Sequence, residues 1–385
     1  MEKKRLGDIC EIVTGATPKT NIKEFWDGDI NWITPAELTE DTYIINESLR
    51  KITTEGVEKT GLKSFPKGTV ILSSRAPIGK VAIAGCEMYC NQGFKNLVCS
   101  KQINNRFLYW YLKGHKEYLN SLGRGATFKE ISKAIVENIE ICLPTLEKQE
   151  KYADILEQCN GIIQIKKGQL RKLDTLVKSR FVELFGDPVI NSRGWKKALI
   201  GDDCFVTKLA GFEYTQYINY EDSGDVVMVK AQNVKNGKLN RKELSFVSNE
   251  VSDSLPRSQL APRDVVMTYV GANIGDVAII DNEYKYHLAP NVAKIRPDSE
   301  RYNSIYFMYM LMLLNAYIVK NSADTAKAAL GMERIRKLNV FVPPMELQNQ
   351  FADFVTFIDK SKPKIQKSLE ETQLLFDSLM QKYFG

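Results

Sequence analysis

The feature that most constrains this chain is an internal duplication, because a repeated sequence must fold into repeated units. Three pairs of segments match in the same order along the chain: 67–83 with 263–279, 29–33 with 225–229, and 143–154 with 342–353. Both members of the first pair contain Ile-Gly-x-Val-Ala-Ile, and both repeats end in Phe-Gly. A collinear match over nearly the whole chain predicts two similar units in tandem.

The first part of each unit is rich in β-branched residues. Short runs such as Thr69–Leu72, Val265–Met267 and Val277–Ile280 are separated by Gly, Pro and Asn, which is typical of strands joined by turns. Within this part, Asn105–Lys113 and its counterpart Ser304–Leu314 read as helices. We therefore expect a mostly β core with a few helices in each unit.

The second part of each unit, after Pro144 or Pro344, becomes helical. Apolar residues recur with alternating spacings of four and three over 152–184 and again over 351–383, which is the a/d seam of a coiled coil. A helix of about 40 residues is roughly 60 Å long, so each long helix needs a partner, and the other one is the nearest candidate. Pro363 is expected to interrupt the second helix, because proline lacks the amide donor and clashes with the preceding turn.

These patterns predict an α+β fold. Two tandem β-rich domains are separated by two long helices that pair as an antiparallel coiled coil, so that a pseudo-two-fold axis relates the repeats. The expected boundaries are 1–144 for the first β-rich domain, 145–186 for the first long helix, 187–343 for the second domain and 344–385 for the second long helix.

Composition narrows the class of protein. The formal net charge of +6 is a mild basic excess, which permits a polyanionic partner without demonstrating one. The N-terminus lacks an apolar signal segment, and the most apolar run, Ile305–Val319, is too short to span a membrane and is expected to be a buried core helix. The seven cysteines form no paired Cys-x-x-Cys set, which fits reduced thiols in a cytoplasmic protein better than a zinc site.

The sequence contains no convincing set of catalytic residues. Its two histidines, His115 and His287, have no metal-ligand partner at a useful spacing, and there is no Gly-x4-Gly-Lys-Ser/Thr phosphate loop. Glu283-Tyr-Lys285 satisfies the Glu-x-Lys part of many nuclease sites but has no clear acidic partner upstream. We therefore predict that the chain is not itself an enzyme and holds no metal.

The loops do offer side chains suited to DNA, since Arg and Lys reach phosphates or guanine edges and Asn and Gln bond adenine. The candidates in the first unit are Lys63, Ser74, Arg75, Lys80, Arg124 and Lys129, and those in the second are Lys230, Gln232, Asn233, Lys235, Arg241, Lys242, Arg257, Tyr269 and Asn273. For any one of them the alternative is an ordinary solvated surface residue. Where the first unit has Arg75-Ala-Pro77 and Lys80, the second has Gly271-Ala-Asn273 and Asp276, so one fold with two loop chemistries indicates two different half-sites.

Several motifs are similar to those of the specificity subunits of type I restriction–modification enzymes, and the resemblance extends over the whole chain. The residues that carry it are Leu6-Gly-Asp8, Thr14-Gly15 with Thr17-Pro18, Gly28–Ile33, Arg75–Lys80, Leu143–Gln149 and Lys178–Gly186. The resemblance implies two target recognition domains, each reading half of a bipartite DNA site. It also implies that the two long helices set the spacing between the halves and dock the modification subunits.

The chemistry implied by the resemblance belongs to partners. Double-stranded DNA, two modification (methyltransferase) subunits and motor–nuclease restriction subunits are expected, in defence against foreign DNA. AdoMet, ATP and Mg²⁺ would be bound by those subunits, and no cofactor is expected in this chain. The expected contacts for partner subunits are Ile155, Ile162, Phe181, Phe354 and Leu375, with packing between the two helices as their alternative role.

The second unit departs from the family pattern at its start. Residues 205–215 lack the Thr-Gly-x-Thr-Pro sequence of the first unit, and Met228 stands where that unit has Trp32. DNA contacts of the first domain therefore do not transfer to the second residue by residue. A different class of function also fits the mild basicity, namely a non-catalytic duplicated tether whose modules bind proteins.

Overall fold

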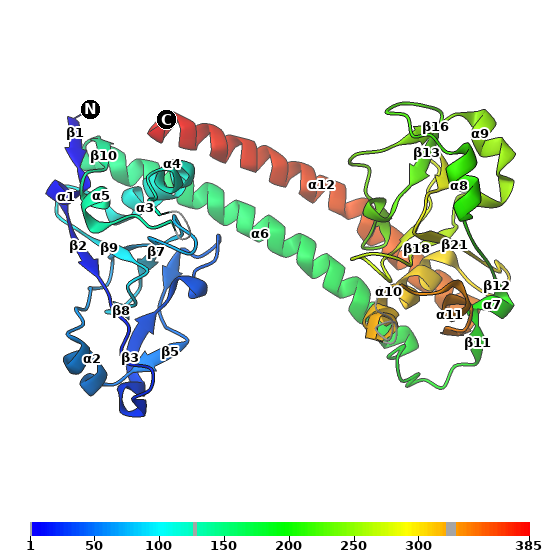
Figure 1. The fold of residues 1–385 in the computed structure, drawn as a ribbon, viewed down its shortest axis with the longest axis horizontal. Helices are drawn as coiled ribbons and strands as arrows, with labels where there is room; N and C mark the ends of the chain where they lie inside the picture. The colour runs from blue at the N-terminus through cyan, green and yellow to red at the C-terminus, as the bar shows by residue number, and fades with distance from the viewer. Residues whose placement is uncertain (1, 126–128, 321–328) are drawn as a thin grey trace. The chain divides into compact units, whose positions relative to one another are not determined.

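The computed structural model describes residues 2–125, 129–320 and 329–385, which form two compact units (Figure 1). Unit 1 comprises residues 1–167 and 366–385, and unit 2 comprises residues 168–365. Each unit therefore contains one β-rich domain together with portions of both long helices. The compact units cut across the domain boundaries expected from the sequence, because each long helix contributes to both.

The β-rich domain of unit 1 contains a five-stranded sheet of order β2-β9-β6-β7-β4, a three-stranded sheet of order β5-β3-β8, and the pair β1-β10. The strands are β1 (Glu2–Arg5), β2 (Cys10–Thr14), β3 (Trp26–Ile33), β4 (Ile44–Ile45), β5 (Arg50–Ile52), β6 (Val70–Leu72), β7 (Val81–Ala84), β8 (Tyr89–Cys90), β9 (Lys95–Cys99) and β10 (Glu140–Leu143). The helices are α1 (Leu6–Ile9), η1 (Lys23–Phe25), η2 (Pro35–Glu37), α2 (Thr54–Thr60), α3 (Asn105–Gly114), α4 (Lys116–Ser121) and α5 (Lys133–Glu137).

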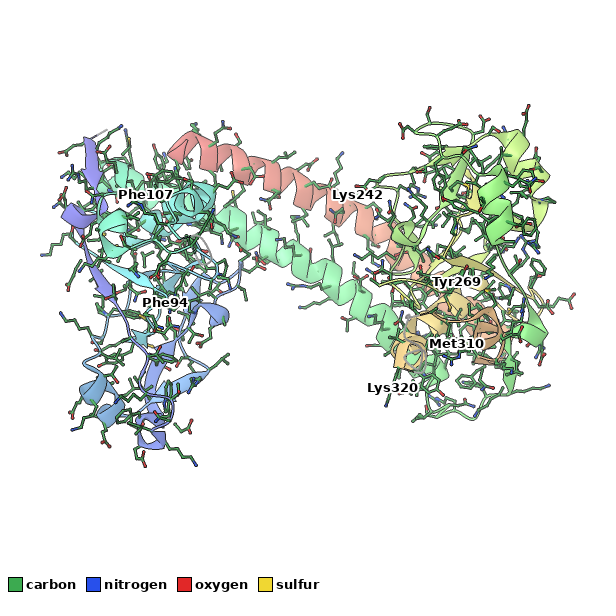
Figure 2. The ribbon with its side chains drawn as sticks, viewed as in Figure 1. Phe94, Phe107, Lys242, Tyr269, Met310 and Lys320 are labelled. Carbon is green, nitrogen blue, oxygen red and sulfur yellow. The ribbon has the colours of Figure 1, made fainter. Side chains whose placement is uncertain are left out.

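The continuous apolar run in β6 is explained by burial of the sheet on both faces. Val70 and Leu72 pack in one cluster with Phe107 of α3 (Figure 2), whereas Ile71 points into a second cluster with Phe65. Alternate residues of a strand face opposite sides, so both sides of β6 are core. α3 was expected over Asn105–Lys113, and it begins there because the side chain of Asn104 accepts hydrogen bonds from two first-turn amides.

The β-rich domain of unit 2 repeats this architecture with the sheets β12-β21-β18-β19 and β16-β13-β20-β17 and the pairs β11-β22 and β14-β15. The strands are β11 (Lys197–Leu199), β12 (Cys204–Lys208), β13 (Val226–Val229), β14 (Val234–Lys235), β15 (Lys238–Leu239), β16 (Phe246–Val247), β17 (Gln259–Leu260), β18 (Val265–Thr268), β19 (Val277–Ile279), β20 (Lys285–Leu288), β21 (Val292–Pro297) and β22 (Asn339–Phe341). The helices are α7 (Ile200–Asp203), α8 (Gly211–Tyr217), η3 (Ala231–Asn233), α9 (Asn249–Ser254), η4 (Pro256–Ser258), α10 (Ser304–Lys320) and α11 (Met332–Arg336).

Strand pairing confirms the duplication. β3 pairs antiparallel with β5 and parallel with β8, and β13 pairs antiparallel with β16 and parallel with β20. The order β2-β9-β6-β7 likewise recurs as β12-β21-β18-β19. The predicted α+β class and the two repeated β-rich domains are therefore observed.

The structure corrects the sequence alignment by one residue upstream of the Ile-Gly turn. The amide of Gly68 donates to Ala84, and the equivalent donor in unit 2 is Arg263, which bonds Ile280, each at 2.8 Å. Gly68, not Lys67, is therefore the counterpart of Arg263, and both have positive φ. Unit 2 has one extra residue in the turn that follows, and the identical residues after that turn hide the shift in an ungapped alignment.

The two long helices are α6 (Leu146–Phe185) and α12 (Met345–Phe384). In unit 1, Tyr152 near the start of α6 stacks on Tyr383 near the end of α12, with ring centroids 3.9 Å apart. In unit 2, Phe181 near the end of α6 meets Phe351 near the start of α12 at 5.3 Å. The helices therefore pair antiparallel, as the spacing of their apolar residues predicts.

The expected interruption at Pro363 is wrong, since α12 continues through it. Proline deprives the carbonyl of Asp359 of its helical donor, but tertiary contacts stabilise this turn. The ammonium of Lys362 lies 2.7 Å from the carboxylate of Asp174 on α6 and 3.2 Å from that of Asp359. The ion pair with Asp174 joins α12 to α6 at the turn that contains Pro363, and α12 is continuous there.

One glutamine in each repeat joins a β-rich domain to its long helix. Gln149 accepts a hydrogen bond from the amide of Asn104 at 2.8 Å and donates to the carbonyls of Gln102 and Pro144. Gln348 does the same with the amide of Asn303 at 2.8 Å and with two carbonyls, those of Arg301 and Pro343. Both side chains are buried, so the start of each long helix is fixed to the start of α3 or α10.

The apolar run Ile305–Val319 forms most of α10, which packs in the core of unit 2 as expected. Met310 lies at its centre (Figure 2). Within the described ranges, no helix is both long and apolar enough to cross a membrane.

Candidate DNA interface

In unit 1, three loops meet at one end of the β-rich domain around a pocket of about 760 Å³. η2 provides Pro35, the turn after β6 provides Arg75 and Pro77, and the turn after β8 provides Asn91. Lys129 completes the wall. The structure therefore brings together Arg75 and Lys129, two of the predicted DNA contacts, beside apolar and amide side chains.

The side chain of Arg75 is only partly engaged by the protein. Its guanidinium lies 3.9 Å from the carboxylate of Glu130, which is bound more closely by the buried ammonium of Lys95 at 3.2 Å. Lys95 also donates to the hydroxyl of Ser74 at 3.2 Å. Because Lys95 lies closer to Glu130 than Arg75 does, the Arg75 guanidinium remains available to pair with an external anion.

Two predicted contacts of unit 1 are structural. Ser74 is fully buried and serves as an acceptor for Lys95. The ammonium of Lys80 donates to the carbonyls of Pro35 and Leu38 at 3.1 and 2.6 Å, so that it holds η2 in place. The assignment of these two residues as DNA contacts is corrected accordingly. Lys63 and Arg124 are exposed but do not line this pocket.

In unit 2 the equivalent loop begins with η3. Asn233 is buried, accepts a hydrogen bond from the amide of Lys230 at 3.0 Å and donates to the carbonyl of Asn240 at 2.9 Å. Asn233 therefore shapes the loop and does not read DNA, contrary to expectation. Lys230 bonds the hydroxyl of Ser245 at 2.9 Å and lies 5.7 Å from the ring centre of Tyr220.

The two predicted arginines of unit 2 are paired internally. Arg241 contacts the carboxylates of Asp281 and Glu283, and Arg257 contacts Glu213 at 3.0 Å. Their charge is therefore compensated within the domain. Four other predicted contacts, Gln232, Lys235, Lys242 and Asn273, are exposed and form no ion pair with a described residue, and Lys242 is labelled in Figure 2.

Tyr269 is the structural counterpart of Ser74, since their amides donate to Asn291 and Gly93 at 2.9 and 2.8 Å. Its ring lies 5.4 Å from the ammonium of Lys208, and burial raises the pKa of its hydroxyl. Tyr269 is half-buried (Figure 2), so the repeat places a tyrosine where unit 1 has a buried serine.

The divergent start of the second unit also differs in structure. In unit 1 the indole of Trp32 donates to the carbonyl of Ala16 at 3.0 Å, and a Cβ on Gly15 would lie 1.9 Å from the carbonyl oxygen of Cys90. Met228 of unit 2 has no donor to replace that of Trp32. The chain instead forms α8, a helix that no sequence pattern predicted.

α8 presents aromatic side chains to solvent. Glu213 caps it by accepting from the amide of Ala210 at 2.8 Å. Phe212 is 68% exposed, and Tyr217 and the neighbouring Tyr220 are also exposed. The sequence signal for this surface is the number of aromatic residues within 212–220. In a core helix these side chains would be buried, whereas here they are exposed.

The residues assigned to partner subunits divide into three groups. Phe181 is buried against Phe351, so its role is helix pairing and the assignment to a partner interface is wrong. Ile155 and Phe354 are half-buried. Ile162 and Leu375 are exposed.

Sequence reasoning missed Leu176. The offset between Gln149 and Gln348 makes it the repeat counterpart of Leu375, and the two side chains are 48% and 53% exposed. Each repeat thus offers an exposed leucine at the same place on its long helix.

The residues whose types could suggest catalysis have separate structural partners. His287 is buried beside the carbonyl of Leu288 at 3.0 Å, and burial lowers its pKa. Glu283 pairs with Arg241, whereas Lys285 bonds Asn249 at 2.9 Å. Among the described residues, no three His, Cys, Asp or Glu side chains form a group that could hold a metal ion.

Two β-rich domains of one topology, with different loops and with a long helix fixed to each, define a duplicated recognition subunit. The model of the type I restriction modification DNA specificity domain matches residues 1–175 and 193–372. The chain therefore belongs to this family of type I specificity subunits, as its motifs predicted.

Individual relatives agree in sequence and in fold. The chain is 29% identical over 399 residues to the type I restriction enzyme MjaIX specificity subunit of Methanocaldococcus jannaschii, covering 98% of this chain and 91% of the relative. It is 21% identical over 363 residues to the EcoBI specificity subunit of Escherichia coli, covering 83% and 75%. The crystal structure of the S subunit from M. genitalium has the same fold, with a TM-score of 0.61, 15% identity, and coverage of 100% of this chain and 96% of that one.

Proposed function

We propose that this chain supplies DNA recognition to a type I restriction–modification complex, each β-rich domain contacting one half of a bipartite site. Methylation, cleavage, AdoMet, ATP and Mg²⁺ belong in this proposal to the modification and restriction subunits. The observation that carries it is the duplication: the strand pairing is the same in both domains, but the side chains at the equivalent loop end differ. Such a pair of domains is suited to reading two different sequences.

In the first domain, Arg75 and Lys129 supply positive charge beside the pocket at the loop end. An arginine on a loop can bond a phosphate or the O6 and N7 atoms of guanine. In the second domain, Lys242 and Gln232 are exposed, and the aromatic side chains of α8 add apolar surface that contacts thymine methyl groups well. Phosphate contacts make such binding weaken as salt increases.

The long helices are suited to fixing the distance between the half-sites. Gln149 and Gln348 join each helix to its β-rich domain at equivalent places. Leu176 and Leu375, exposed at equivalent positions, are suited to contact two copies of one partner. We therefore include the docking of two modification subunits in the proposal.

The test is methylation-sensitive sequencing of DNA from cells that contain the modification subunit with or without this chain. A bipartite adenine-methylated motif that requires the chain is the expected result. Exchanging residues 1–144 for those of another specificity subunit should then change one half of the motif and preserve the other half and the spacing. Methylation by an active modification subunit that does not depend on the chain would refute the proposal and favour the protein-binding tether.

A further inference from the structure

Unit 1 contains an ion-pair cluster that joins the start of α3 to α6. The guanidinium of Arg106 lies 2.8 Å from the carboxylate of Asp154 and 3.1 Å from that of Glu157. The hydroxyl of Tyr43 donates to Glu157. Burial, together with this hydrogen bond, raises the pKa of Tyr43. The site is thus filled by an arginine that the chain itself provides.

The repeat identifies the corresponding positions in unit 2. Gln149 and Gln348 occupy equivalent places, and so do Asn104 and Asn303 to which they bond. Counting from these pairs, Arg106, Asp154 and Glu157 correspond to Ile305, Asp353 and Thr356. Unit 2 therefore keeps one carboxylate of the cluster and lacks its arginine.

The tyrosine is missing as well. The amide of Ile83 donates to the carbonyl of Tyr43 at 2.8 Å, and in unit 2 the amide of Ile279 donates to Gly237 at 3.3 Å. Gly237 has no side chain, and a Cβ there would lie 2.9 Å from the sulfur of Met308. Three large or charged side chains of unit 1 are thus replaced by smaller, neutral ones.

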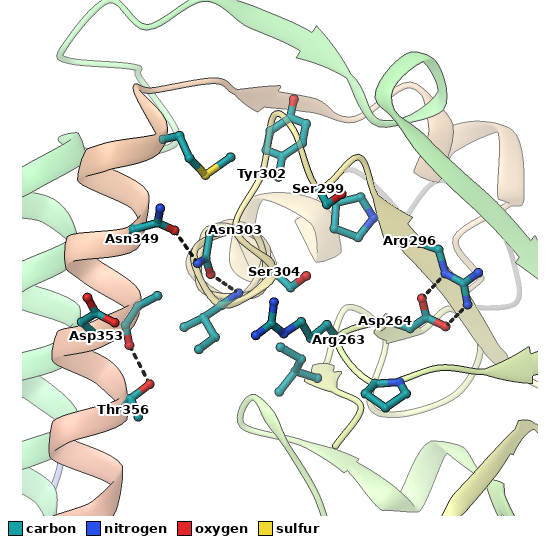
Figure 3. A pocket seen from close by; sticks show the side chains of 16 residues that line it. Arg263, Asp264, Arg296, Ser299, Tyr302, Asn303, Ser304, Asn349, Asp353 and Thr356 are labelled. Atoms are coloured by element: carbon teal, nitrogen blue, oxygen red, sulfur yellow. Dashed lines mark hydrogen bonds and ion pairs between the residues drawn. The ribbon is translucent and has the colours of Figure 1, made fainter. Parts of the chain in front are cut away.

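At the positions that correspond to Arg106, Asp154 and Glu157, unit 2 has an open pocket of about 610 Å³ (Figure 3). Ile305, Asp353 and Thr356 all line it. The hydroxyl of Thr356 donates to the carbonyl of Ala352 at 2.8 Å, so it does not donate to the carboxylate of Asp353. Among the described residues, the exposed carboxylate of Asp353 has neither a hydrogen-bond donor nor an ion-pair partner. Unit 2 presents the carboxylate of an arginine site without the arginine.

The charges on the opposite wall do not complete the site. Arg296 is bound to Asp264 by two hydrogen bonds of 2.5 and 2.7 Å, and Figure 3 shows this pair across the pocket from α12. Arg263 lines the same pocket and is exposed, but it forms no ion pair with Asp353. The place that corresponds to Arg106 is therefore open to a side chain from outside.

We propose that this pocket receives an arginine side chain of the modification subunit, whose guanidinium pairs with Asp353. The inference rests on the proposed function, and it names one contact through which the modification subunit binds this chain. The repeat supplies the argument for arginine, because the same framework in unit 1 is occupied by Arg106. Phe357, 68% exposed and four residues after Asp353 on the same face of α12, gives the partner an apolar contact beside the pocket.

The proposal has a structural consequence for the complex. Unit 1 fills its own site with Arg106, so only unit 2 can accept an arginine from outside. Two copies of the modification subunit would then bind this chain unequally, and the copy at unit 2 alone would depend on Asp353.

The experiment is a titration of the full chain with purified modification subunit, followed by native mass spectrometry. Asp353→Asn keeps the shape of the side chain and removes its charge, and Ile305→Arg restores an internal arginine that fills the pocket. Each variant should weaken one of the two binding steps by about tenfold or more, so that complexes with a single modification subunit accumulate. Asp154→Asn is the matched control in unit 1 and should leave both steps unchanged.

The outcomes separate the two levels of the proposal. If the unaltered chain binds no modification subunit, the proposed function fails. If the unaltered chain binds two copies and both unit 2 variants also bind two equally well, the arginine site is refuted. If Asp353→Asn weakens binding of the second modification subunit but Ile305→Arg does not, the occupant does not lie in the place of Arg106. That result would also overturn the arginine site. An Arg263→Ala variant with the same loss as Asp353→Asn would assign the pairing to the chain's own arginine and overturn it too.

Discussion

Replacing Gln348 by leucine should destabilise unit 2 by about 2–4 kcal/mol. Gln348 is fully buried and satisfies the amide of Asn303 and two carbonyls, those of Arg301 and Pro343. Leaving each group unsatisfied costs about 1–2 kcal/mol, or roughly 3–6 kcal/mol in total. The apolar surface that leucine buries offsets about 1–2 kcal/mol of this loss.

The assay uses Trp195, the only tryptophan among residues 168–365. Labelling with 5-fluorotryptophan gives four ¹⁹F resonances, of which one reports on unit 2. For a denaturant slope of about 2 kcal/mol per molar urea, the midpoint followed at Trp195 should fall by roughly 1–2 M. Gln149→Leu should instead move the transition of the three tryptophans in unit 1.

The matched control is Gln350→Leu, because Gln350 lies two residues away on the same helix and is exposed. Its effect should remain within about 0.5 kcal/mol. If Gln348→Leu shifts the Trp195 transition no more than Gln350→Leu does, the three hydrogen bonds do not hold α12 to its β-rich domain. The helices would then have no fixed attachment through which to set the spacing of the half-sites.

Four further predictions follow from the same contacts. Gln348→Glu should be least stable at neutral pH, because the new carboxylate would face two carbonyls. The pKa of this carboxyl in the folded state should then lie above its unfolded value of about 4.3, so the urea midpoint should rise as the pH falls through the folded pKa. Arg75→Ala should weaken DNA binding and make it less salt-dependent, whereas Arg257→Ala, whose charge is already paired, should change the salt slope little. Phe212→Ala should alter the methylated motif in one half only, and an unchanged motif would exclude α8 from recognition. Pro363→Ala should stabilise unit 2 by up to about 3 kcal/mol and so raise its urea midpoint. A lower midpoint would show that proline suits this turn.

The sequence predicted the parts of the fold that depend on periodic burial. The spacing of apolar residues gave the two long helices, and the run 305–319 gave α10 as a buried helix. Such patterns are visible locally because every third or fourth residue faces the same partner. The break expected at Pro363 was wrong, and the contact with Asp174 that the structure shows at this turn comes from a distant part of the sequence.

The candidate site was predicted less completely, for the same reason. Ser74 and Asn233 have the chemistry of DNA contacts, but both are buried and form hydrogen bonds with Lys95 and Asn240. Arg241 is compensated by Asp281, forty residues away. Composition can identify a donor, but only the tertiary structure shows whether that donor is already satisfied.

The duplication also separates what the fold requires from what recognition can change. Gly79 and Gly275 both have positive φ, and Gln149 and Gln348 both satisfy backbone groups, so these positions are constrained by backbone geometry in each repeat. Other side chains differ, such as Trp32 and Met228, and so does the segment near them: unit 1 has a loop whose Ala16 carbonyl accepts from the indole of Trp32, whereas unit 2 has α8. A half-site can therefore be rewritten by exchanging loop residues while the framework and its attachment to the long helices stay the same. If this separation is correct, a second domain with Met228→Trp and the loop of residues 14–26 in place of 208–222 should fold and still assemble with modification subunits, but methylate a different half-site.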